Sequence, residues 1–150
     1  MIELAATVII TASSVLLFGY WFRYTCLLIL SAKTTRDYAG EVATANQLGF
    51  LEVQSALHVA ASAEFDRLQA SLDRDYKLLT YLIHHAAGAQ GEASLEVRML
   101  QLNYRLAGIW YRTSRRLSPA AARRALEEMS QVVAHFANAM GEMTSGAATA

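Results

Sequence analysis

The chain of 150 residues has few of the residues that cross-link or interrupt a fold. It contains one cysteine, Cys26, and one proline, Pro119. A single cysteine excludes a disulfide within the chain and permits a reducing compartment without requiring one. Because proline is the residue that most strongly breaks helices, its near absence is compatible with long helices over most of the sequence.

Charge is also scarce. Charged residues make up 17% of the chain, hydrophobic residues make up 54%, and the formal net charge is zero. This composition excludes a disordered chain, which combines low hydrophobicity with high net charge. It also argues against a nucleic-acid partner, because such a domain carries a positive surface. The charge is unevenly distributed, with +2 over residues 1–36, −5 over 37–92 and +3 over 93–150.

Motifs that specify a reaction or a cofactor are missing. The four histidines form no haem-attachment, HExxH or di-iron pattern, and there is no GxSxG nucleophile motif. The glycines at 88–91 lack the strand and the Lys-Ser/Thr of a phosphate loop, so they predict a turn. We therefore expect no enzyme activity, no cofactor, no metal and no small-molecule substrate. A redox module with haem held by two histidines is kept as a lesser alternative.

The longest apolar run lies at the N-terminus. Nineteen uncharged residues run from Leu4 to Phe22, and nine more follow Arg23. A helix of that length rises roughly 28 Å, close to the thickness of a bilayer core, so the run predicts one transmembrane helix. Glu3 stands where a cleaved signal peptide would be basic, so removal is not expected. A buried helix in a soluble core is the alternative, but the remaining chain is short for surrounding it.

The residues after the span predict its orientation. Arg23, Lys33 and Arg36 follow the apolar run, and no basic residue precedes it. The positive-inside rule therefore predicts a single-pass membrane protein with its N-terminus outside and its C-terminal domain in the cytoplasm. Three aromatic residues surround Arg23: Tyr20, Trp21 and Tyr24. This grouping favours a position for Arg23 at the membrane interface; burial against a partner is the alternative.

A stripe of small polar residues lies on the predicted span. Thr7, Thr11 and Ser14 recur at spacings of four and three, which places them on one face of a helix. In lipid such a stripe permits close helix contact, so these residues are candidates for contact with a partner. The alternative is that each hydroxyl binds a carbonyl of its own helix.

Periodicity of 3.6 residues continues from residue 38 almost to the end. It predicts a first helix from about Tyr38 to Ala87, loosened at Gly40 or Gly49. The glycine-containing residues 87–94 predict a break, with Ser94 as the N-cap of the next helix. The predicted buried face of the first helix is Leu57, Ala61, Phe65, Leu68, Leu72, Tyr76, Leu79 and Ile83.

Two further helices follow. Ser118 and Pro119 are placed as N-cap and first residue of the last one. The predicted buried face of the second helix is Leu95, Met99, Leu102, Leu106, Ile109 and Thr113. The predicted buried face of the last helix is Ala122, Leu126, Met129, Val133, Phe136, Met140 and Met143. Met at this spacing is typical of a core, with an adaptable partner groove as the alternative.

Together these patterns predict an all-α fold. A transmembrane anchor with a basic flank occupies residues 1–36, a cytoplasmic helical bundle 37–143, and a flexible tail 144–150. The bundle is predicted as a long helix and an antiparallel helical hairpin, which form three helices. A first helix of nearly fifty residues extends roughly 75 Å, about twice the length of either later helix. Residues 38–56 would therefore lack a partner within the chain.

Apolar side chains in that surplus segment are candidates for contact with lipid headgroups, another subunit or a second copy of the chain. These are Val42, Leu48, Phe50, Leu51 and Val53.

Arginines dominate the charge of the C-terminal part. No acidic residue lies between Glu96 and Glu127. The candidates for binding a partner or lipid are Arg98, Arg105, Arg112, Arg115, Arg116, Arg123 and Arg124. Because the first three are seven residues apart, they form a stripe on one helix face. Three interpretations remain open: pairing with the acidic first helix, binding an acidic partner, and binding anionic headgroups.

The features above favour a non-catalytic accessory, anchoring or scaffolding subunit of a membrane assembly. The partners expected are protein subunits or a second copy, and membrane lipid. The alternative is a membrane-tethered regulatory adaptor that uses the arginine stripe. A lesser alternative is a filament subunit, because MIEL opening an apolar helix is similar to type IV pilins, which keep an acidic residue near that helix start. The chain departs from the pilin pattern at Arg23 and in lacking a processing leader.

Overall fold

The computed structural model describes residues 1–32, 36–87 and 94–148, and it divides the chain into two units. The described residues form helices and no strands, which confirms the all-α prediction. The first unit is residues 1–32 and the second is residues 33–150. Lys33 and the predicted turn at 88–91 lie outside the described residues.

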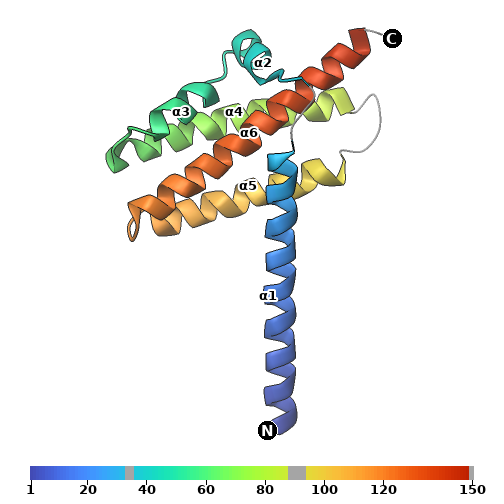
Figure 1. The fold of residues 1–150 in the computed structure, drawn as a ribbon, viewed down its shortest axis with the longest axis vertical. Coiled ribbons are helices and arrows are strands. Elements are labelled where there is room, and N and C mark those ends of the chain that lie inside the picture. The colour runs from blue at the N-terminus through green and yellow to red at the C-terminus, as the bar shows by residue number, and fades with distance from the viewer. Residues whose placement is uncertain (33–35, 88–93, 149–150) are drawn as a thin grey trace. The chain divides into compact units, whose positions relative to one another are not determined.

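The first unit is one helix, α1, which runs from Ile2 to Ser31. It spans 30 residues and is long and apolar enough to cross a membrane. Every side chain from Ile2 to Trp21 is exposed. The predicted N-terminal apolar helix is therefore present (Figure 1).

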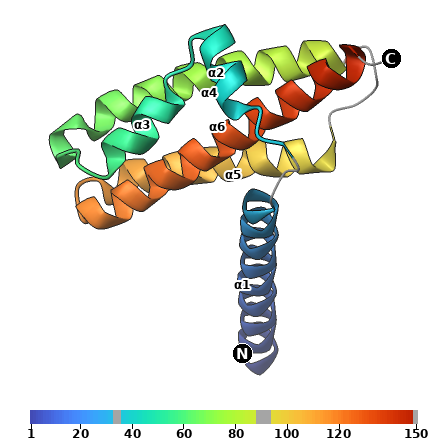
Figure 2. The same ribbon diagram turned by 45° about the horizontal axis from the view of Figure 1, so that its top comes forward.

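The second unit contains five α-helices among its described residues. They are α2 (Ala39–Asn46), α3 (Phe50–Leu57), α4 (Phe65–Ala87), α5 (Leu95–Ser114) and α6 (Pro119–Ala148), with a short 3-10 helix, η1, at Ser62–Glu64. Helix α6 contacts α2, α3, α4 and α5, so it is the central element. Figures 1 and 2 show that α4 and α6 run in the same direction, while α5 runs against both.

The core lies along α4 and α6, on most of the face that periodicity predicts for each, although Ala61 and Met143 of the predicted faces are exposed. Phe65, Leu72 and Leu79 of α4 are buried, as are Leu126 and Phe136 of α6. The predicted caps are also confirmed at both later helices. Ser94 accepts a hydrogen bond from the Val97 N–H at 3.3 Å, and Ser118 accepts one from the Ala121 N–H at 3.3 Å. Helix α6 extends to Ala148, so most of the predicted tail is helical.

The prediction of one helix from Tyr38 to Ala87 was wrong. Gln47 follows α2 in the left-handed conformation, with φ 53°, and this ends the helix. Gly49 then stands as the N-cap of α3. After α3 the backbone becomes extended at Ala61 before η1 begins. Because the chain turns at these points, α2 and α3 fold back onto the bundle instead of extending beyond it.

The predicted buried face of α5 was also wrong. Leu102, Leu106 and Ile109 are 48%, 46% and 59% exposed. The face that packs inward contains Val97, Leu100, Asn103, Tyr104, Ala107, Gly108, Tyr111 and Ser114. Leu106 and Tyr104 lie about 160° apart around the helix, so the two faces are nearly opposite. Hydrophobic periodicity does not identify the inward face, because several of its side chains are polar.

Candidate interaction surfaces

The surface of α1 is apolar on all sides. Leu16 and Phe18, near its middle, are 74% and 72% exposed. Arg23 is exposed as well. The hydroxyls of Thr7 and Ser14 donate to the carbonyls of Glu3 and Ile10, each at 2.8 Å. These two members of the small polar stripe are thus satisfied by their own helix, and a contact through the stripe stays a prediction.

The segment 38–56 has a partner inside the chain, which corrects the expectation that it has none. Val42, Leu48, Phe50 and Val53 are buried, with exposed fractions between 0% and 9%. Helix α2 packs on α6, and α3 packs on both α4 and α6. Of the five candidate contact residues only Leu51 is exposed. The breaks around Gln47 and Gly49 explain this result, because they let two short helices cover the bundle.

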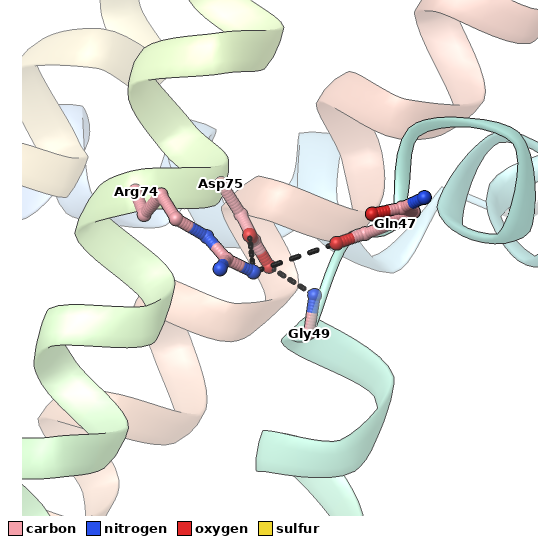
Figure 3. A network of polar contacts seen from close by, with 4 residues as sticks. All are labelled: Gln47, Gly49, Arg74 and Asp75. Atoms are coloured by element: carbon pink, nitrogen blue, oxygen red, sulfur yellow. Dashed lines mark hydrogen bonds and ion pairs between the residues drawn. The ribbon is translucent and has the colours of Figure 1, made fainter.

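A polar network holds the turn between α2 and α3 against α4 (Figure 3). The Gly49 N–H donates to Oδ2 of Asp75 at 2.7 Å, and the Asp75 side chain is buried. Arg74 donates to Oδ1 of Asp75 and to the Gln47 carbonyl, each at 3.4 Å. A carboxylate is stabilised at a helix N-terminus, where N–H groups lack helical partners. Asp75 thereby joins α3 to α4 at the start of α3.

Arg123 performs the matching role at the other end of α3. Its guanidinium donates to the carbonyl of Leu57 and, at 3.0 Å, to that of Ala60. It also lies 5.3 Å from the centroid of the Phe65 ring. A cation satisfies the last carbonyls of a helix and is attracted to an aromatic face. Arg123 therefore binds its own chain and is a poor candidate for binding a partner.

Arg115 is also engaged within the domain. Its Nη1 donates to Oδ1 of Asp66 in α4, and the Tyr111 hydroxyl donates to the same oxygen at 2.7 Å. The Tyr111 hydrogen bond, with Arg115 adding to it, lowers the pKa of Asp66. Burial raises the pKa of Tyr111 to about 12, and its bond to Asp66 acts in the same direction. Of the three interpretations left open for the arginines, Arg115 thus follows the first, pairing with an acidic residue of the predicted first helix.

Two tyrosines stack between α4 and α5. The Tyr76 and Tyr104 rings are parallel, with centroids 3.9 Å apart. The Tyr104 hydroxyl donates to Oδ1 of Asp73 at 2.8 Å. Burial raises the pKa of both phenols, and at Tyr104 the hydrogen bond to Asp73 raises it further. Both rings are therefore neutral at pH 7, and a tyrosine, not an arginine, donates to the Asp73 carboxylate here.

A cleft of about 400 Å³ lies beside this stack, between α4 and α5. Lys77, Arg105 and Arg112 contribute three cationic groups to its lining, and Asp73 contributes one acidic group. Ile109 lines the same cleft from α5. Because the Tyr104 hydroxyl already donates to the Asp73 carboxylate, the cationic groups set the charge of the cleft. Its chemistry fits an anion of the size of a phosphate group.

The remaining arginines lie on the surface. Arg98, Arg116 and Arg124 are exposed, as are Arg105 and Arg112. Arg98, Arg105 and Arg112 occupy one edge of α5, as their spacing predicts. Arg115 and Arg123 are thus held by hydrogen bonds within the domain, and all of the seven candidates except Arg123 are exposed.

An exposed apolar face runs along α5, beside this arginine edge. Its members, with the turn that follows, are Leu95, Leu102, Leu106, Ile109, Trp110 and Leu117. Sequence periodicity identified most of this face but assigned it to the core. Single exposed apolar residues are ordinary, whereas a continuous row on one helix marks a contact surface.

Polar contacts between α5 and α6 are structural. The Asn103 side chain donates to Oε1 of Glu128 at 2.8 Å, and both residues are buried. His135 and Glu96 meet at 2.8 Å near the start of α5. Across the described residues, no three His, Cys, Asp or Glu side chains come together as a metal site would require.

Comparison with family models, curated proteins and solved structures finds no match for this chain.

Proposed function

We propose that this chain is a single-pass membrane protein that serves as a non-catalytic accessory or scaffolding subunit of a membrane assembly. One observation carries the anchoring: the apolar side chains of α1 surround the helix and are exposed from Ile2 to Trp21. Such a surface is stable in lipid and unstable in water. The basic residues that follow the span support an orientation with the helical domain in the cytoplasm.

The surfaces of the helical domain support the accessory role. The domain offers binding groups in the exposed apolar row of α5 and in the cationic cleft lined by Arg105 and Arg112. The same cleft favours a second candidate function, that of a membrane-tethered adaptor that binds an anionic ligand.

Anchoring is tested by placing a charge at the centre of α1. Leu16→Arg costs about 2.5–3.5 kcal/mol of insertion free energy, because arginine is strongly disfavoured at the middle of a transmembrane helix. The variant is expected to leave the membrane fraction on alkaline carbonate extraction, whereas Leu16→Ile is expected to stay. Equal retention of both variants in the pellet would contradict the proposal.

Orientation and subunit role need separate measurements. In a Cys26→Ser background, a cysteine introduced at Ile2 is expected to react with an impermeant maleimide in intact cells, and one at Ala150 is not. Reaction at Ala150 alone would reverse the orientation. For the subunit role, the chain solubilised in mild detergent is expected to migrate in a complex of fixed stoichiometry. Migration as a free single chain would contradict the role.

A further inference from the structure

Helix α5 has one buried face and, nearly opposite to it, one exposed apolar face that the bundle does not use. The inward face packs through Leu100, Tyr104 and Tyr111, which are 0–4% exposed. The outward face presents Ile109 and Trp110, each 59% exposed. A helix that only completes a bundle has a polar outer side. The outward row therefore needs an occupant that is apolar at its contact.

Charge defines what kind of occupant fits. The edge of α5 beside the apolar row carries Arg98, Arg105 and Arg112, and the chain has no acidic residue between Glu96 and Glu127. On the same side lies the cleft of about 400 Å³, to which Lys77 adds a third cation beside Arg105 and Arg112. A helix with leucines and tryptophan on one face and arginines along its edge is the pattern that lies in the interface of an anionic bilayer.

The domain follows the proposed transmembrane helix closely in the chain, so a bilayer surface is near it. Helix α1 ends at Ser31 and α2 begins at Ala39, so only residues 32–38 connect the apolar helix to the domain. At about 3.3–3.6 Å per residue a connection of this length keeps the domain near the membrane surface. With the domain in the cytoplasm, that surface is the leaflet rich in anionic lipid.

We propose that the outer face of α5 binds the anionic surface of the bilayer that α1 crosses. Leu102, Leu106 and Trp110 enter the boundary between headgroups and acyl chains. Arg105 and Arg112, with Lys77 at the cleft, bind headgroup phosphates. This inference rests on the proposed anchoring. A protein partner is less well matched, because the short connection to α1 keeps this face at the membrane surface, where headgroup phosphates lie directly beside the apolar layer.

The two tryptophans of the chain allow anchoring and surface binding to be read separately. Trp21 lies in α1 and Trp110 in α5. Trp21→Phe leaves Trp110 as the reporter, and Trp110→Phe leaves Trp21. Both side chains are 59% exposed, so neither change disturbs the core. Each full-length variant is reconstituted into vesicles of phosphatidylcholine, alone or mixed with phosphatidylserine, in which brominated acyl chains quench tryptophans that contact lipid.

Trp110 is expected to be quenched and blue-shifted in vesicles that contain phosphatidylserine. The quenching is expected to be lost in phosphatidylcholine alone and in molar salt, which screens charges beyond about 3 Å. If Trp21 is quenched and Trp110 is not, the chain is anchored and the inference is overturned. If Trp21 itself escapes quenching, the proposed anchoring fails. A blue shift of Trp110 without lipid quenching, which grows with protein density, indicates a second copy and also overturns the inference.

Charge variants test the arginine edge. Arg105→Gln with Arg112→Gln is expected to remove the quenching of Trp110. The matched control is Arg67→Gln with Arg124→Gln, which removes the same charge from exposed positions on α4 and α6. Equal loss in both would overturn the assignment to this edge. The double variant Leu102→Ser with Leu106→Ser leaves all arginines in place and tests the apolar row. It is also expected to lose the quenching of Trp110. Full quenching of Trp110 in this variant would overturn the role of the apolar row.

Discussion

Helices α1 and α6 are equally long and differ in almost every other respect. Each spans 30 residues. In α1 the apolar side chains point in all directions, and those from Ile2 to Trp21 are exposed. In α6 they form a stripe, of which Leu126, Val133 and Phe136 are each 0% exposed. The distribution of apolar residues around a helix, more than their number, decides whether it packs within its own chain.

Helix α5 combines the two patterns. Its inward face resembles the stripe of α6, since Tyr104 and Tyr111 are buried and bond to carboxylates of α4, and the helix contacts α6 as well. Its outward face resembles α1, since Ile109 and Trp110 stay exposed. Helix α5 is thus intermediate between α1 and α6 in the exposure of its apolar residues.

The chain divides into two units, α1 and the helical domain. Three pairs of substitutions, one in each unit, test whether the stability of the domain is independent of α1.

The largest effect is expected from deleting a core ring. Phe136 in α6 is 0% exposed and stacks near Tyr76, with centroids 6.0 Å apart. Phe136→Ala is expected to cost the domain about 3–5 kcal/mol of unfolding free energy, because a cavity replaces the ring. Phe18→Ala in α1 is expected to leave that free energy unchanged. Urea unfolding of the full chain in detergent, followed by circular dichroism, measures both. Comparable losses would show that α1 contributes to the stability of the domain.

A smaller effect is expected where α6 meets Tyr38. A Cβ added at Gly141 would lie 2.3 Å from the Cβ of Tyr38, so one of the two backbones must move. Gly141→Ala is expected to cost about 1–3 kcal/mol, the range for overpacking. Gly19→Ala in α1 and Gly146→Ala in α6 meet nothing within 4 Å and are the controls. Thermal unfolding is the measurement; a Gly141→Ala midpoint no lower than that of Gly146→Ala would show that Tyr38 moves aside freely.

The smallest effect is expected in alkaline solution. Tyr111 has a pKa raised to about 12, so it holds its proton more tightly in the folded domain than in the unfolded chain. The stabilisation it provides is complete below pH about 10 and is lost as the pH rises through about 12. Tyr111→Phe is expected to make unfolding less steeply dependent on pH in this window, and Tyr20→Phe in α1 is expected to change nothing. Identical pH slopes for Tyr111→Phe and the unsubstituted chain would contradict the assignment.

Periodicity predicts those parts of the domain in which apolar and buried faces coincide. The inward faces of α4 and α6 and the caps at Ser94 and Ser118 follow directly from spacing and local hydrogen bonding. The break at Gln47 could not be predicted with the same rules, and Gly49 was predicted to loosen the helix but not to begin a new one. No proline lies near these positions. Helix α2 ends because Gln47 adopts a positive φ, a conformation that is uncommon for residues other than glycine.

The polar half of the α5 core could not be predicted for a different reason. Asn103, Tyr104 and Tyr111 become suitable core residues only because Glu128, Asp73 and Asp66 stand opposite them. Those pairs are separated by 25, 31 and 45 positions, beyond the reach of a local pattern. Hence periodicity assigned the leucine-rich face of α5 to the core. That face is instead the apolar surface that the bundle leaves exposed.

The hydrogen bond from the Tyr38 N–H to Oδ1 of Asn138, 2.7 Å long, has a mechanical consequence. The chain that follows α1 enters the domain at this point, so a pulling force between α1 and the domain is applied there first. Helix α2 has eight residues and would peel from α6 before the core between α4 and α6 is loaded. With α1 anchored as proposed, a pulling force would detach α2 and lengthen the connection between α1 and the bundle before the bundle itself opens.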